Sequence, residues 1–203
     1  LAWFVDHRSG WAVAMARVVT WLGSAPVITA VCAGAFVVFW RRGLALVVAV
    51  APGVSAVVAV IGASVAKQVF GRPRPPVGLH LVTAHEPAFP SGHATSSAAV
   101  YLTISLAVAA ELLRRWWPRV AAVGVGLGVA GMVGLSRLIL GVHWPSDVVA
   151  GWALGVAVAV AVSTSALVVE RVGSVSPVGG EPGPWARALG QMRRTRPRAA
   201  AGP

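Results

Sequence analysis

Residues 44–66 read LALVVAVAPGVSAVVAVIGASVA, an unbroken run of 23 residues without a charged side chain. A helix needs roughly 20 apolar residues to cross the hydrocarbon core of a bilayer, so this run is long enough to span a membrane. Arg41 and Arg42 precede the run, and Lys67 follows it. Long basic side chains at the ends of a span can reach the polar headgroups. The stretch therefore predicts a transmembrane helix.

Outward from this run, four more apolar runs of similar length predict further transmembrane helices at 24–40, 93–113, 120–140 and 145–169. The composition agrees, because 57% of the 203 residues are hydrophobic and only 11% are charged. A soluble domain carries roughly 25% charged residues. A soluble enzyme of this length could not bury so much apolar surface. The sequence therefore predicts an all-α integral membrane helical bundle with five transmembrane helices.

Small residues fill these runs, and small residues allow helices to approach one another closely in lipid. Gly124, Gly128 and Gly131 either mark such a helix–helix contact or simply reflect a composition that is rich in glycine.

The two ends of the chain differ from this membrane-embedded domain, which we place at residues 23–169. Residues 1–22 mix tryptophans with charged side chains, which predicts an N-terminal amphipathic helix lying on the membrane surface. We expect a break in the helix between Gly23 and Pro26. Residues 170–203 are rich in proline, glycine and arginine and predict a disordered basic tail.

The charge of the chain is strongly positive, with 17 Lys and Arg residues against six Asp and Glu residues and a net charge of +11. The basic residues stand in short clusters between apolar runs, so we expect a lipid bilayer and no nucleic acid as the partner. Clusters at 41–42, 114–119 and 171–198 fall on one side when five spans alternate, and the positive-inside rule makes that side cytoplasmic. The loop 67–92 and the short loop after Leu140 then face the extracytoplasmic side of the cell membrane.

The loop after the run 44–66 begins KQVFGRPRPP, residues 67–76, and contains three cations within eight residues. For Arg72 taken alone, contact with lipid headgroups is the simpler interpretation. Three cations on the side that the positive-inside rule disfavours need another explanation. An anionic ligand held at the membrane surface would supply one.

Two further motifs stand beside the same face of the predicted bundle. Residues 90–93 read PSGH directly before an apolar run, so Ser91 lies at or near the N-cap of a helix whose free N–H groups form an anion site. In the second motif His143 and Asp147 are four residues apart, with Pro145 near the first helical position. A carboxylate there can hold one imidazole nitrogen and leave the other free as an acceptor. Taken alone, either motif also fits a capped helix or a surface His–Asp pair.

Together these motifs resemble the three-part signature of the type-2 phosphatidic acid phosphatase family, the lipid phosphate phosphatases. Eleven signature positions are matched in order, in the patterns Lys67-x6-Arg74-Pro75, Pro90-Ser91-Gly92-His93 and Ser136-Arg137-x5-His143-x3-Asp147. The resemblance covers about residues 23–169. Family members of this size usually have six spans, so we expect that the core is truncated at its N-terminus.

The resemblance implies a role for each matched residue. His143 would attack phosphorus and form a phosphohistidine, Asp147 would orient His143, and His93 would protonate the leaving oxygen and then activate water. The phosphoryl oxygens would be bound by Lys67, Arg74, Ser91, Gly92 and Arg137. Phosphoryl transfer spreads negative charge over three equatorial oxygens, and fixed cations at a helix N-terminus stabilise that charge.

The resemblance implies neither a metal nor a cofactor. A two-metal phosphatase would need several clustered carboxylates and histidines. His80, His85 and Glu86 could form a small cluster, but we favour a solvated or lid role for them, in a loop 75–90 that covers the site. We also favour an interfacial anchor over a substrate contact for Trp144.

The favoured function is hydrolysis of a lipid phosphate or pyrophosphate, with a polyprenyl pyrophosphate such as undecaprenyl pyrophosphate as the preferred substrate by family analogy. Phosphatidic acid and phosphatidylglycerol phosphate are the alternatives. A vanadium haloperoxidase would share the site, but those enzymes are soluble. A non-catalytic transporter or scaffold would account for the spans and leave the motifs unexplained. The sequence leaves the oligomeric state open.

Overall fold

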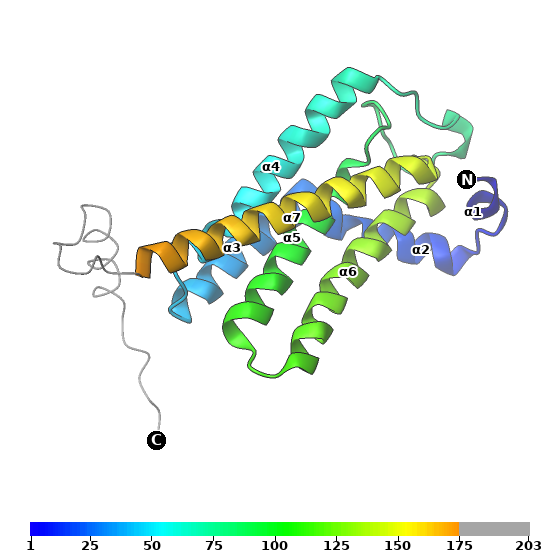
Figure 1. The fold of residues 1–203 in the computed structure, drawn as a ribbon. Helices are drawn as coiled ribbons and strands as arrows, with labels where there is room; N and C mark the ends of the chain where they lie inside the picture. The colour runs from blue at the N-terminus through cyan, green and yellow to red at the C-terminus, as the bar shows by residue number, and fades with distance from the viewer. Residues whose placement is uncertain (175–203) are drawn as a thin grey trace.

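The computed structural model describes residues 1–174, and this part of the chain folds into helices with no strand (Figure 1). The α-helices are α1 (Ala2–Asp6), α2 (Gly10–Val19), α3 (Ala25–Arg41), α4 (Leu46–Phe70), α5 (Gly92–Ala107), α6 (Trp116–Ile139) and α7 (Pro145–Ser174). The 3₁₀ turns η1 (Thr20–Gly23) and η2 (Val77–Leu79) and a π-helical turn, η3 (Val108–Leu112), join them. The disordered tail expected at 170–203 lies almost wholly outside the described residues, and α7 continues through its first five positions.

Four helical segments are long and apolar enough to cross a membrane, namely α4, α5 with η3, α6 and α7. A fifth candidate is the pair Gly10–Gly23 and Ala25–Arg41, which is bent by 55°. The expected all-α membrane bundle is therefore confirmed, with four spans or five if the bent pair counts as one.

The expected first span, residues 24–40, corresponds to α3, whose 17 residues count as a candidate span only together with the preceding helix and turn. Ser24 has an extended backbone, and Pro26 follows near the helix start, so the preceding turn cannot continue straight into α3. The break expected between Gly23 and Pro26 is the site of the bend. The location of residues 1–22 on the membrane surface stays a prediction.

Helix α5 is at the centre of the bundle, because it contacts α3, α4, α6 and α7. Two glycines of α7 allow a very close approach to α5. A methyl group on Gly151 would lie 2.8 Å from the carbonyl oxygen of Ser91, and one on Gly155 would lie 2.5 Å from that of Thr95. Only the absence of a side chain permits these distances, and small residues spaced by four are a common device for packing helices in lipid.

The glycines that we considered on 120–140 do not make such a contact. Around Gly124, Gly128 and Gly131, a methyl group would meet nothing within 4 Å among the described residues. The glycines of α6 that contact other helices are Gly126, which packs against Ser105, and Gly134, which packs against the ring of Trp152. Within the part of the chain that the structure describes, Gly124, Gly128 and Gly131 therefore do not mark a helix–helix contact.

The ends of α4 and α6 and the starts of α5 and α7 lie at one end of the bundle, which is also where α1 and α2 lie (Figure 1). The N-terminal segment packs there through Ala16, which is buried with Leu140 and Val142. The arginine-rich connections after α3 and before α6 lie at the other end. All three sequence motifs are therefore gathered at the end away from these two arginine-rich connections.

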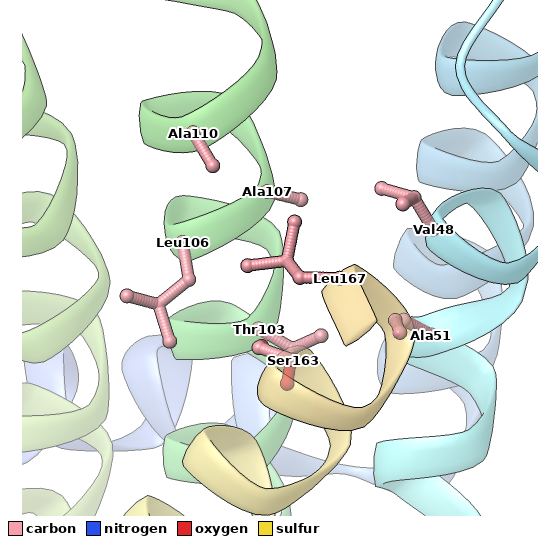
Figure 2. A pocket seen from close by; sticks show the side chains of 9 residues that line it. Val48, Ala51, Thr103, Leu106, Ala107, Ala110, Ser163 and Leu167 are labelled. Atoms are coloured by element: carbon pink, nitrogen blue, oxygen red, sulfur yellow. The ribbon is translucent and has the colours of Figure 1, made fainter. Parts of the chain in front are cut away.

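Near the opposite end, α4, α5 and α7 enclose a small cavity of about 20 Å³ (Figure 2). Its lining is mainly aliphatic, including Val48, Leu106 and Leu167. A volume of this size has room for little more than one water molecule. It is too small for a substrate and too far along the helices to belong to the motifs.

Candidate active site

The connection between α6 and α7 places His143 and Asp147. Gly141 has a φ of +72°, and a methyl group there would overlap the carbonyl oxygen of Leu79, so only glycine fits this turn. Trp144 is followed by Pro145 at the first position of α7. The Asp147 Oδ2 atom accepts a hydrogen bond of 2.8 Å from the Trp144 N–H, as an acidic residue in the first turn does in a capping box. The helix start itself therefore fixes Asp147 beside His143.

The His143 imidazole is buried between a carboxylate and a guanidinium. Its Nδ1 atom lies 3.5 Å from Asp147 Oδ2, and its Nε2 atom lies 3.2 Å from Arg74 Nη1. Burial lowers the pKa of His143 to about 4, Asp147 opposes this shift, and the positive charges of Arg74 and Arg137 add to it. At neutral pH the ring is therefore uncharged. An acceptor beside Nδ1 and a donor beside Nε2 fit the tautomer that carries its proton on Nδ1 and a lone pair on Nε2.

Arg72 is a partner of Asp147 that the sequence motifs did not predict. Its Nη1 atom donates to Asp147 Oδ1 at 2.9 Å and to Ser146 Oγ at 2.6 Å, and its guanidinium lies over the Trp144 ring at 5.8 Å from the centroid. Arg72 is therefore partnered within the protein, and contact with headgroups, the simpler interpretation for Arg72 taken alone, is not needed to explain its charge. The only signal in the sequence was its place between two cations of a signature motif.

Lys67 and Arg74 both contact Glu86 in the loop that follows them. Helix α4 is capped by Gly71, which has a φ of +54° and donates its N–H to the Lys67 carbonyl, so Lys67 stands in the last turn. The Lys67 Nζ atom pairs with Glu86 Oε2 at 2.5 Å, which lowers the pKa of Glu86. Arg74 donates to the carbonyl oxygens of Glu86 at 2.6 Å and Val142 at 2.8 Å, and burial lowers its pKa.

The start of α5 faces the start of α7. Ser91 occupies the N-cap position and donates its N–H to the Asp147 carbonyl at 2.9 Å, so two motifs are joined by a backbone hydrogen bond. Its Oγ atom is buried without a hydrogen-bond partner among the described residues. A methyl group on the neighbouring Gly92 would lie 4.0 Å from Lys67 Nζ. The N-terminus of α5 is therefore close to a cation and has an unused hydroxyl.

Arg137 and His93 complete the constellation. Arg137 is only 6% exposed, and its Nη1 atom donates to Thr20 Oγ1 at 2.7 Å. Its Nε atom has no partner among the residues that the structure describes. His93 and Arg137 line one cavity together with Thr20. Buried donors without partners are rare in proteins, and here they suit an anionic ligand.

The expected metal-free chemistry stays a prediction, but the loop histidines can be placed. His80 Nε2 lies 2.9 Å from the Pro75 carbonyl oxygen, and Glu86 is paired with Lys67. Within residues 1–174, no group of three or more side chains of the metal-binding types comes together. The cluster of His80, His85 and Glu86 that we considered does not form.

A model of the PAP2 superfamily matches residues 44–169, more than half of the chain. The chain belongs to this superfamily. The matched range contains all eleven signature positions and every residue of the site described above except Thr20. In this PAP2 chain, the motifs thus meet at one end of the bundle.

The chain spans about half the length of two curated relatives that it matches. The chain is 34% identical over 110 residues to an undecaprenyl-diphosphatase of Sulfolobus acidocaldarius, which is 50% of this chain and 47% of that protein. It is 36% identical over 109 residues to a decaprenylphosphoryl-5-phosphoribose phosphatase of Mycobacterium tuberculosis, which is 52% of this chain and 54% of that protein.

Among solved structures, a transmembrane PAP2-type phosphatidylglycerolphosphate phosphatase from Bacillus subtilis is similar, with a TM-score of 0.72 and 26% identity over 83% of each chain. LpxE from Aquifex aeolicus shares the fold, with a TM-score of 0.62 and 19% identity over 79% of this chain and 90% of that one. With its apolar helices and these neighbours, the PAP2 chain is a multi-pass membrane protein.

Proposed function

We propose that this PAP2 protein is a membrane phosphatase that hydrolyses lipid phosphates through a phosphohistidine intermediate. One observation carries the proposal: His143 is buried and uncharged at neutral pH, with Nδ1 toward Asp147 and Nε2 toward Arg74. A neutral imidazole with a free Nε2 lone pair is a nucleophile at neutral pH, and a carboxylate beside Nδ1 stabilises the positive charge that the ring acquires in the reaction.

The reaction has two steps. The His143 Nε2 atom forms a bond to phosphorus while the bond from phosphorus to the leaving oxygen breaks, and His93 gives that oxygen a proton. Water then attacks the phosphohistidine, gives a proton to His93, and releases inorganic phosphate and free His143. Lys67, Arg74 and Arg137 stabilise the charge on the phosphoryl oxygens, with the Ser91 hydroxyl and Gly92 N–H as further donors. No step in this scheme needs a metal-bound hydroxide.

The preferred substrate is a polyprenyl diphosphate such as undecaprenyl diphosphate. The name of the Sulfolobus relative and the mycobacterial relatives named for decaprenylphosphoryl phosphoribose support a polyprenyl lipid. Phosphatidylglycerol phosphate is the second candidate, supported by the name of the Bacillus structure. Phosphatidic acid is a third. The site faces the outer leaflet of the cell membrane on this proposal, because it lies opposite the arginine-rich connections.

The test measures phosphate release by the purified protein in excess EDTA, with farnesyl diphosphate, phosphatidylglycerol phosphate and phosphatidic acid in micelles. H143A should lose roughly 10⁴-fold or more in kcat if nucleophile and acid act as a unit. H7A is the matched control, because His7 is exposed and stacks on Trp3 outside the site. An H143A protein that keeps more than about a tenth of the wild-type rate would reject the nucleophile. Dependence on added Mg²⁺ would reject the metal-free scheme.

A further inference from the structure

A cavity of about 400 Å³ lies beside the candidate site, on the side of His93. Its wall includes His93 and Arg137 from the site, Arg17 and Thr20 from the N-terminal segment, and Thr83 from the loop. His143 is not among the described residues that line it. The cavity therefore borders the site on the acid's side and not on the nucleophile's side.

The geometry of phosphoryl transfer determines which part of the substrate lies on the side of His93. In an in-line displacement the nucleophile and the leaving oxygen lie on opposite sides of phosphorus. His143 approaches from one side, so the leaving group lies on the side of His93, which protonates it. On the proposed function, this cavity is thus the place of the group that departs from phosphorus.

The wall of this leaving-group cavity combines an apolar part, formed by Trp21, Leu81 and Val82, with positive charge and hydroxyl groups. It has the guanidinium groups of Arg17 and Arg137 and the hydroxyls of Thr20, Ser24 and Thr83, and no acidic side chain is among its described lining residues. A leaving group that is a simple alcohol with an acyl or prenyl tail would not need a second guanidinium. A leaving group that carries its own phosphate would.

Arg17 is placed to serve such a phosphate. Its side chain is exposed, and its hydrogen bond among the described residues runs from Nη2 to the Leu81 carbonyl oxygen at 3.5 Å, the outer limit of a hydrogen bond. A guanidinium has five N–H donors in a planar fork that matches phosphate oxygens. Thr20, three residues on, is buried and bound to Arg137, so this part of the segment is fixed to the site.

We infer that Arg17 binds a second phosphate that stays on the leaving group, and that it selects substrates carrying one. The inference rests on the proposed function and deepens it. It favours a lipid diphosphate, or a lipid whose phosphodiester stands one glycerol or sugar away from the cleaved phosphate. It disfavours phosphatidic acid, whose leaving group is a neutral diacylglycerol.

The test compares R17Q with the wild type on two pairs of micellar substrates. One pair is farnesyl diphosphate and farnesyl monophosphate, and the other is phosphatidylglycerol phosphate and phosphatidic acid. R17Q should lose about tenfold or more in kcat/KM on the member with the second phosphate, the size expected for a lost charge-assisted hydrogen bond, and clearly less on the other member. R17K should recover part of the selectivity. The pair with the larger effect identifies an adjacent or a more distant phosphate.

Arg8 provides the matched control. It also comes from the N-terminal segment and donates to a loop carbonyl, that of Leu79 at 2.9 Å, but the cavity wall does not include it among the described residues. R8Q should therefore change kcat/KM for both members of a pair alike.

Equal losses in R17Q on both members, no loss at all, or the same selectivity in R8Q would overturn the inference. Wild-type protein that cleaves only the single-phosphate substrates would overturn it too, while the proposed function would stand. Wild-type protein that cleaves none would overturn both.

Discussion

Three contacts of the candidate site converge on Asp147. Its Oδ1 atom accepts from Arg72, its Oδ2 atom accepts from the Trp144 N–H, and the same Oδ2 lies beside His143 Nδ1. The carboxyl group is fully buried, whereas the Arg72 side chain is 38% exposed. A buried carboxylate needs such partners to stay charged and in place. Arg72 is therefore placed to act on His143 through Asp147.

We expect R72Q to lower kcat by about 10- to 100-fold, because a charge-assisted hydrogen bond that orients Asp147 is lost. KM should change little, since Arg72 holds Asp147 and not the phosphoryl group. R72K should recover part of kcat. R119Q is the control, because Arg119 donates to the Leu113 carbonyl near the opposite end of the bundle. A raised KM with an unchanged kcat would show that Arg72 binds substrate instead.

The pH dependence follows from the buried state of His143. Its pKa lies near 4, so the neutral, nucleophilic form persists until the pH falls to about that value. We expect the acid limb of kcat/KM that belongs to the nucleophile to lie near pH 4, well below the usual range of an exposed histidine. The substrate's own ionisation, followed by its ³¹P shift over the same pH range, is the control. A limb near 6.5 that the substrate does not explain would contradict the buried neutral state.

At the residue scale, spacing alone predicted that His143 and Asp147 lie together, because four residues at a helix start form one turn. The same reasoning could not reach the pair of Arg72 and Asp147, which are 75 positions apart. Nor could it predict the ion pair between Glu86 and Lys67, because the path of the loop determines both contacts. Residue spacing determines contacts within one helical turn, but contacts between distant loops depend on how the bundle packs.

At the element scale, the crossing of α5 and α7 holds the motifs together. The N–H of Ser91 bonds to the Asp147 carbonyl just above the close contacts at Gly151 and Gly155. A larger residue at either glycine would push the start of α5 away from the start of α7. The signature residues of both helices would then move apart.

We expect G155L to destabilise the protein, because its side chain would overlap the Thr95 carbonyl and the Ala98 side chain. Overpacking of a helix contact costs typically about 1–3 kcal/mol. G128L makes the same change at a position where a methyl group meets nothing within 4 Å among the described residues, and it should be nearly neutral. Thermal unfolding in detergent and phosphate release measure both variants. Equal stability of the two would show that the crossing does not depend on Gly155.

The apolar runs predicted the positions of α4 to α7 closely, because length and hydropathy are properties of each run by itself. They also predicted the 17-residue length of α3 and the break before it, but they did not predict the 55° bend from the preceding helix. The glycines that face another helix could not be told from those that face lipid. Small residues are frequent on every face of these helices, and only the packed structure separates the faces.

At the scale of the whole molecule, charge and chemistry lie at opposite ends. Arg41 and Arg42 end α3, and Arg114 and Arg115 lie between α5 and α6, whereas Lys67, Arg74 and Arg137 lie at the end with the motifs. The first group is exposed, as positive-inside residues are. The cations near the motifs are partnered by loop atoms or by Thr20. The basic residues thus form two groups that differ in exposure and in partners.

This separation leads to a test of orientation in the membrane. In a C32S background, single cysteines are placed at Val77, which is 81% exposed in the loop near the site, and at Glu111, which is exposed beside the arginines before α6. An impermeant thiol reagent added to intact cells should label V77C and spare E111C, because the positive-inside rule keeps the arginine end in the cytoplasm. Both should be labelled after the cells are permeabilised, which shows that each thiol is accessible. Labelling of E111C alone in intact cells would place the site in the cytoplasm, and the outer-leaflet substrate would have to be abandoned.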